Sequence, residues 1–102
     1  MIRGTTPHFT LEVNGIDLSD KTIYVTIEQD ETEIDVKNPE CEPTESGCTL
    51  SFDLTQDQSL MFRSGRASMQ IRYIDEEGVA GASGVKTFLV GKVLKEGDIA
   101  YE

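Results

Sequence analysis

Residues 22–37, Thr-Ile-Tyr-Val-Thr-Ile-Glu-Gln-Asp-Glu-Thr-Glu-Ile-Asp-Val-Lys, decide the fold of this chain. Apolar side chains occupy every second position up to Ile27, and the alternation resumes with Ile34 and Val36 after a short polar gap at 29–32. A period of two places successive side chains on opposite faces of an extended strand. Both arms are rich in β-branched residues, which favour strands. The stretch therefore predicts a hairpin with one buried face and one face in water.

The same alternation recurs on both sides of this hairpin. It predicts further strands at 8–13, 48–54, 69–75 and 85–94, with polar turns between them,. Thr-Gln-Asp-Gln at 55–58 matches a capping box and predicts a single helical turn,. We therefore predict an all-β fold, an antiparallel immunoglobulin-like β-sandwich of about six to seven strands with one short helical turn.

A chain of 102 residues is long enough for one hydrophobic core and too short for two,. We expect a single β-sandwich domain over residues 1–102, with an N-terminal arm at 1–7 and a C-terminal tail at 96–102. Residues 38–47 contain two prolines and no large apolar residue, which argues against a central strand,. They are predicted to form a flexible acidic loop.

The charge balance limits the choice of partner. The chain carries 19 acidic and 9 basic residues, a formal net charge of −10. A surface of that sign repels phosphate backbones and anionic lipid headgroups, so neither nucleic acid nor a membrane is an expected partner. The N-terminus lacks the apolar centre of a secretory signal, which predicts synthesis and folding in the cytoplasm.

Side chains that commonly carry catalysis are scarce. His8 is the single histidine and stands on the polar side of the first predicted strand, so an exposed structural residue is expected rather than a general base,. The spacing of Cys41 and Cys48 does not match a zinc motif,. They are expected to be free thiols, and a disulfide between them stays an alternative. We therefore predict no enzyme activity and no catalytic residue, cofactor or metal.

Two surfaces are candidates for binding another protein. The last predicted strand is apolar on both faces, as in a strand at an interface, and its candidate residues are Phe88, Val90 and Leu94,. The second surface lies in residues 28–45, where eight acidic residues and one lysine leave a local charge of −7. It is either a solvated edge protected by charge from pairing, or an anionic face for a basic partner. Its candidate residues are Glu28, Asp30, Glu31, Glu33 and Asp35.

Four segments carry a resemblance to a known group of proteins. They are Arg-Gly-Thr-Thr-Pro at 3–7, Leu-Thr-Gln-Asp-Gln-Ser-Leu-Met-Phe at 54–62, Gln-Ile-Arg at 70–72 and Ala-Ser at 82–83. In these segments the chain resembles small uncharacterised phage and prophage proteins of Gram-positive bacteria. The opening pentapeptide is the most distinctive piece, and the acidic loop at 38–47 is longer than is usual in the group.

The resemblance implies a phage setting and brings no activity with it. Small immunoglobulin-like domains in that setting serve as decorations, adaptors or tail and baseplate parts. We therefore expect a non-enzymatic virion or assembly component that binds phage structural proteins, or itself as a homo-oligomer. It would be made in the host cytoplasm and then enter the virion. The alternative is a soluble acidic inhibitor of a host nucleic-acid-binding enzyme.

Overall fold

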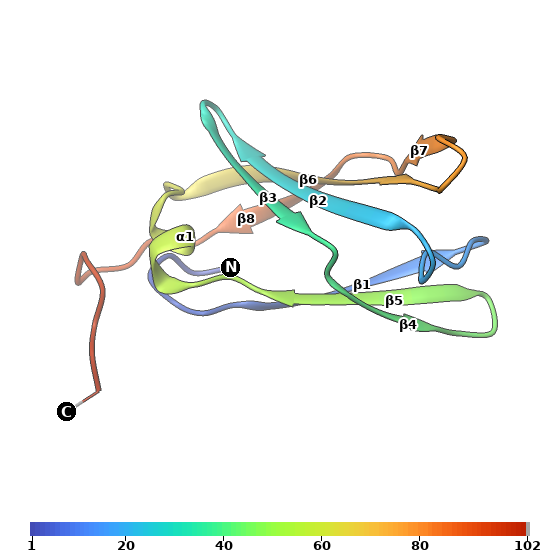
Figure 1. The fold of residues 1–102 in the computed structure, drawn as a ribbon. Coiled ribbons are helices and arrows are strands. Elements are labelled where there is room, and N and C mark those ends of the chain that lie inside the picture. Colours follow the sequence, from blue (N-terminus) through green and yellow to red (C-terminus); the bar gives the residue numbers. More distant parts are fainter. Residues whose placement is uncertain (102) are drawn as a thin grey trace.

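The computed structural model describes residues 1–101, which form eight strands and one short helix in two layers (Figure 1). The elements in chain order are β1 (His8–Asn14), β2 (Thr22–Gln29), β3 (Thr32–Lys37), β4 (Glu40–Pro43), β5 (Gly47–Asp53), α1 (Gln56–Leu60), β6 (Gly65–Ile74), β7 (Ala80–Ala82) and β8 (Lys86–Val90).

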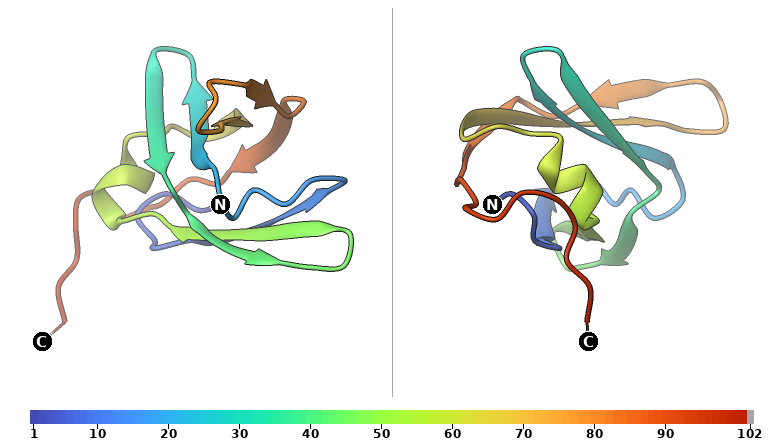
Figure 2. Two further views of the ribbon diagram at one scale, coloured as in Figure 1. Left: turned by 45° about the vertical axis from the view of Figure 1, so that its right-hand side comes forward. Right: turned by 90° about the vertical axis from the view of Figure 1, so that its left-hand side faces the viewer.

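Two antiparallel sheets make up the layers, as the two further views in Figure 2 also show. The first sheet has the order β1-β5-β4. In the second, β3 pairs with β2 and β2 with β6, while β7 and β8 pair with successive parts of the far edge of β6. The prediction of an all-β sandwich is confirmed, and its immunoglobulin-like assignment stays a prediction. The strand number exceeds the expected six to seven because β4 and β7 are too short for an alternation to show.

The hairpin at residues 22–37 forms as predicted. Its register places Val25 opposite Val36 and Ile27 opposite Ile34, so both arms turn their apolar side chains toward the same face. A two-residue turn joins the arms, and its first residue, Asp30, has a positive φ of 53°. Aspartate tolerates this conformation better than most residues do, which lets so tight a turn form without glycine.

Part of the predicted flexible loop is a strand, so that prediction is wrong over β4. Glu40–Pro43 pairs with β5 and lies at the edge of the first sheet. A proline lacks the backbone N–H that a central strand needs, but an edge strand has one side without a ladder partner. The two prolines therefore exclude a central position in the sheet, but they are compatible with a strand at its edge.

Apolar side chains from both sheets and from the end of the helical turn form the core between the layers. β2, β5 and β6 contribute most of it because they occupy the inner positions of the two sheets. The buried hydrophobic residues are Leu18, Ile23, Val25, Ile27, Ile34, Cys48, Leu50, Phe52, Leu54, Phe62, Ala67, Met69, Ile71 and Val90.

Helix α1 closes one end of the sandwich and begins with the predicted capping box. The Gln58 backbone N–H donates to Thr55 Oγ1 at 3.1 Å, and the Thr55 N–H donates to Gln58 Oε1 at 2.9 Å. The buried Ser59 hydroxyl accepts from the Gly4 N–H at 3.0 Å and donates to the Thr5 carbonyl at 2.7 Å, which fastens the N-terminal arm. Within the described chain, no helix has the length and apolar character to cross a membrane.

Candidate functional site

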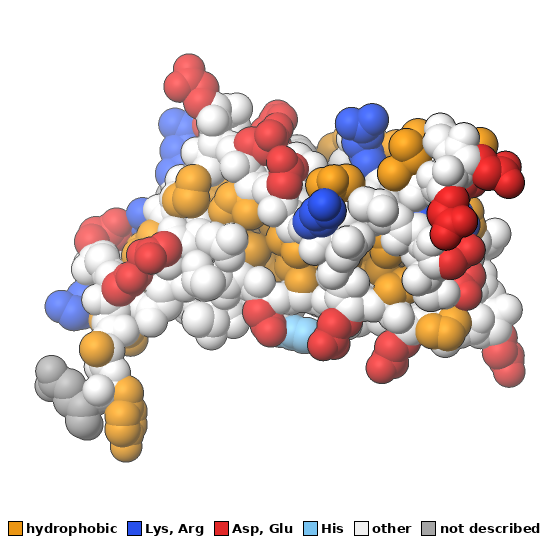
Figure 3. Space-filling model, in the orientation of Figure 1, with side chains coloured by type: hydrophobic (Ala, Val, Ile, Leu, Met, Phe, Trp, Pro, Cys, Tyr) orange, Lys and Arg blue, Asp and Glu red, His pale blue; other side chains and the backbone are white. Residues whose placement is uncertain are grey.

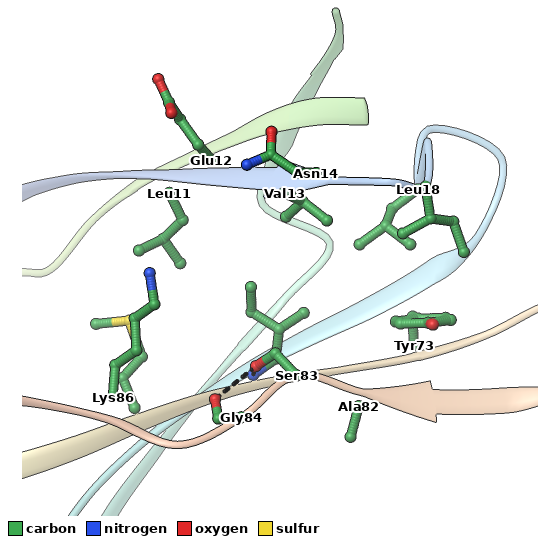
Figure 4. Close-up of a pocket in the computed structure, with 13 residues that line it drawn as sticks. Leu11, Glu12, Val13, Asn14, Leu18, Tyr73, Ala82, Ser83, Gly84 and Lys86 are labelled. Atoms are coloured by element: carbon green, nitrogen blue, oxygen red, sulfur yellow. Dashed lines mark hydrogen bonds between the residues drawn. The ribbon is translucent and has the colours of Figure 1, made fainter. Parts of the chain in front are cut away.

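A groove opens between the two layers along one side of the sandwich and has a volume of about 320 Å³. Leu11 and Val13 of β1 point into it from one sheet (Figure 4). Tyr73 of β6, Ser83 and Lys86 lie on the opposite side. Leu11 and Val13 face inward but are only partly buried, because little covers them on this side. The groove is therefore a part of the interior that remains open to solvent.

The groove exists because the strands on this side leave backbone edges without neighbours. Within residues 1–101, β1 pairs with β5 alone, so the backbone groups along its other edge have no neighbouring strand. On the opposing sheet, the N-terminal arm covers only the end of β8, where the Arg3 N–H donates to the Gly91 carbonyl at 3.0 Å. An unpaired edge beside an apolar hollow can accept an additional extended chain.

The interruption between β7 and β8 shapes one wall of the groove. Ser83 fills the break, since its hydroxyl accepts from the Ile71 N–H at 3.0 Å and its own N–H donates to the Ile71 carbonyl at 2.9 Å. Beside it, Gly81 lies against the Tyr73 ring, and a Cβ on Gly81 would come within 2.4 Å of that ring. Glycine at position 81 therefore permits a close approach between this backbone and the Tyr73 ring,.

The groove carries a positive charge at its mouth. The Lys86 ammonium group points toward β1, whereas the Glu12 carboxylate points away from the hollow (Figure 4). Within the described chain, no ion pair involves Lys86. An apolar hollow with one free cation suits a ligand that is mostly apolar and bears a single carboxylate.

The candidate interface residues Phe88, Val90 and Leu94 do not form one surface. Val90 is 3% exposed and belongs to the core, and Phe88 packs edge-on against Phe9 with ring centroids 5.8 Å apart. Leu94 is 91% exposed and lies beyond the end of β8. β8 therefore turns Phe88 and Val90 inward, and its own exposed apolar residue is Leu89, which that prediction passed over.

The candidate acidic residues do gather at one hairpin. All five are exposed, and Glu28 lies directly opposite Glu33 in the β2–β3 ladder. Asp30, in the turn, forms an ion pair with Arg63, and Asp35 accepts a hydrogen bond from the Thr26 hydroxyl at 2.6 Å. Figure 3 shows acidic side chains on this hairpin and others at the far end of the molecule.

The single histidine lies on an open outer face. His8 Nδ1 is 2.7 Å from Asp53 Oδ1, its register partner in β5, and both side chains are more than half exposed. This partner is a carboxylate, so it is not the hydroxyl or thiol nucleophile that a histidine base activates. Exposure of His8 was expected from its place on the polar side of the strand.

Comparisons with known proteins found no match from which a family could be assigned. No protein-family model matches the chain, and no curated protein or solved structure matches it either.

Proposed function

We propose that this domain is a non-enzymatic component of a phage or prophage particle, or of its assembly, and that it acts by protein–protein contact. Decoration, adaptor and tail or baseplate roles all fit this description. The observation that carries the proposal is the groove beside the free edge of β1, where partly buried Leu11 and Val13 have no covering strand. The sequence resemblance to phage proteins supports the setting.

The occupant that we propose is an extended segment of a phage structural protein. Main-chain groups of such a segment would pair with the β1 edge, and alternate apolar side chains would enter the hollow beside Val13. A carboxylate on the segment would meet Lys86, the free cation at the mouth. Affinity would come chiefly from the strand pairing and the apolar contacts, and the charge would fix the register.

Mass spectrometry of purified particles and assembly intermediates tests this proposal. We expect the chain to be present in them. The variant Lys86→Glu should be incorporated about tenfold less, because a repelled carboxylate at the mouth costs on the order of 1.4 kcal/mol. Lys92→Glu makes the same charge change at an exposed position outside the groove and should be incorporated normally.

Two results would count against the proposal. Absence of the chain from both particles and intermediates would remove the virion or assembly role. Equal incorporation of Lys86→Glu and the wild type, with both folded by circular dichroism, would remove the groove as the contact.

A second candidate function is inhibition of a host nucleic-acid-binding enzyme by the acidic hairpin. The observation that favours it is the direct opposition of Glu28 and Glu33, both exposed. Like charges directly across a ladder destabilise a sheet, and a basic groove on another protein would relieve that repulsion. The surface would then occupy the place of a nucleic-acid backbone on the enzyme.

Nuclease activity in a host-cell extract provides a test of this second function. The purified chain should lower DNA cleavage, and added salt should weaken the effect because the attraction is electrostatic. Combined Glu31→Lys and Glu33→Lys substitutions should abolish inhibition. The matched change Glu76→Lys with Glu77→Lys, in the hairpin before β7, should leave it intact. Inhibition that is equal for both double variants would exclude the acidic hairpin as the cause.

A further inference from the structure

Three potential metal ligands from separate parts of the chain meet near one end of the sandwich. Asp17 lies in the loop between β1 and β2, Cys41 in β4 and Cys48 in β5. Their ligand atoms, one carboxylate oxygen and two sulfurs, all lie within 4.8 Å of one another. The spacing of these residues in the sequence did not predict the group, because Asp17 is distant in the chain from both cysteines and β4 was expected to be a loop.

The fold itself brings these side chains together. In the β4–β5 ladder, Cys41 lies opposite Leu50 and Cys48 lies opposite Pro43, so the two cysteines are diagonal neighbours on one face,. The Asp17 loop is held in place beside them by Leu18, which is completely buried. Asp17 Oδ1 accepts from the Ser19 N–H at 2.9 Å, which orients the carboxylate and leaves its second oxygen available.

The diagonal placement favours a shared ion over a disulfide. Diagonal neighbours in a sheet have Cα atoms about 7–8 Å apart. A disulfide usually spans about 4.4–6.8 Å between Cα atoms. Ligands of a tetrahedral zinc ion stand farther apart than bonded sulfurs, at about 3.5–4 Å from one another. Small side-chain rotations would bring atoms that are already within 4.8 Å to that spacing.

Burial and charge at the cluster also fit a cation. Cys48 is 1% exposed, while Cys41 is partly exposed and gives access from solvent. Two thiolates and a carboxylate would be costly here without a compensating charge, and a bound dication supplies that charge.

We propose that Asp17, Cys41 and Cys48 bind one zinc ion. The two thiolates and the carboxylate would occupy three corners of a tetrahedron, and a water molecule from the exposed side would occupy the fourth. Thiolate ligands select zinc over the hard ions magnesium and calcium. Such an ion would join the β1–β2 loop to the β4–β5 hairpin.

Titration of the purified, fully reduced chain with zinc tests the site. A chromophoric chelator would report competition for the ion, and cobalt would report thiolate coordination through its charge-transfer absorption. We expect one ion per chain, a higher melting temperature with zinc, and weaker binding at lower pH because the thiols must lose protons. Cys41→Ser should weaken zinc binding by at least about 100-fold, since it removes a thiolate from the partly exposed side.

The variant Asp17→Asn tests whether zinc binding can be weakened while the protein stays folded. An asparagine oxygen can still accept from the Ser19 N–H, but it lacks the charge of a ligating carboxylate, so zinc affinity should fall about tenfold or more while the fold is kept. Asp20→Asn removes the same charge from an exposed residue of the same loop and should bind zinc normally. Three results would overturn the proposal: no stoichiometric zinc binding by the reduced wild type, equal affinity of Asp17→Asn and Asp20→Asn, or a Cys41–Cys48 disulfide formed in air in preference to the zinc complex.

Discussion

Replacing Gly47 with alanine is expected to destabilise the protein by at least about 3 kcal/mol, which is severe for a single substitution. A Cβ at this position would lie 1.9 Å from the Val13 carbonyl oxygen and 3.0 Å from the Ile16 carbonyl oxygen. Both neighbours are backbone atoms, so no side-chain rotation can relieve the clash. The ends of β1 and β5 would have to separate where Gly47 now pairs with Asn14.

Urea unfolding followed by circular dichroism measures this effect. Gly84→Ala is the matched control, because its Cβ would meet no atom within 4 Å. The control should change the free energy of unfolding by less than about 0.5 kcal/mol. An unfolding midpoint for Gly47→Ala equal to that of Gly84→Ala would show that the two strands do not approach each other as described.

Truncation of Phe62 to alanine should be about as damaging, with an expected loss of about 3–5 kcal/mol. Phe62 is 1% exposed and is among the largest fully buried side chains. It follows α1, where its carbonyl accepts a hydrogen bond from Arg3 Nε. The neighbouring Arg63 N–H donates at 2.7 Å to the buried Gln29 Oε1. Because the backbone on both sides is fixed, the cavity cannot collapse easily.

Thermal unfolding provides the measurement for Phe62. The melting temperature should fall by at least about 12 °C, because each kcal/mol of lost stability lowers it by about 4 °C in a domain of this size. Met61→Ala truncates the preceding residue, which is 56% exposed, and should shift the melting temperature by only about 2 °C,. Similar shifts for both variants would contradict the burial of Phe62.

Local signals in the sequence were enough to predict much of the fold. The hairpin at residues 22–37 follows from its alternation, since a period of two fixes which side chains share a face. The helical turn follows from the capping box, in which the contacts between Thr55 and Gln58 are local. In both cases the information lies within a few neighbouring residues.

Features that depend on distant partners could not be predicted in the same way. The inward face of β8 is set by its register on β6, where Ala67 lies opposite Phe88, and both strand phases were apolar enough to compete. The groove depends on which edge of β1 stays free, and the ligand cluster at Asp17 depends on a loop meeting two strands. No local pattern records such contacts.

The pairing of the chain's beginning with its end has a consequence for folding during synthesis. β1 needs β5, with Phe9 opposite Phe52, and the Arg3 N–H needs the carbonyl of Gly91. The ribosome must therefore extend the chain past β5 before β1 can pair, and past Gly91 before the Arg3 N–H can donate its hydrogen bond. Contacts between residues so far apart in sequence also make folding slow. Until then the apolar side of β1 stays exposed to solvent on the nascent chain, where a chaperone can bind it.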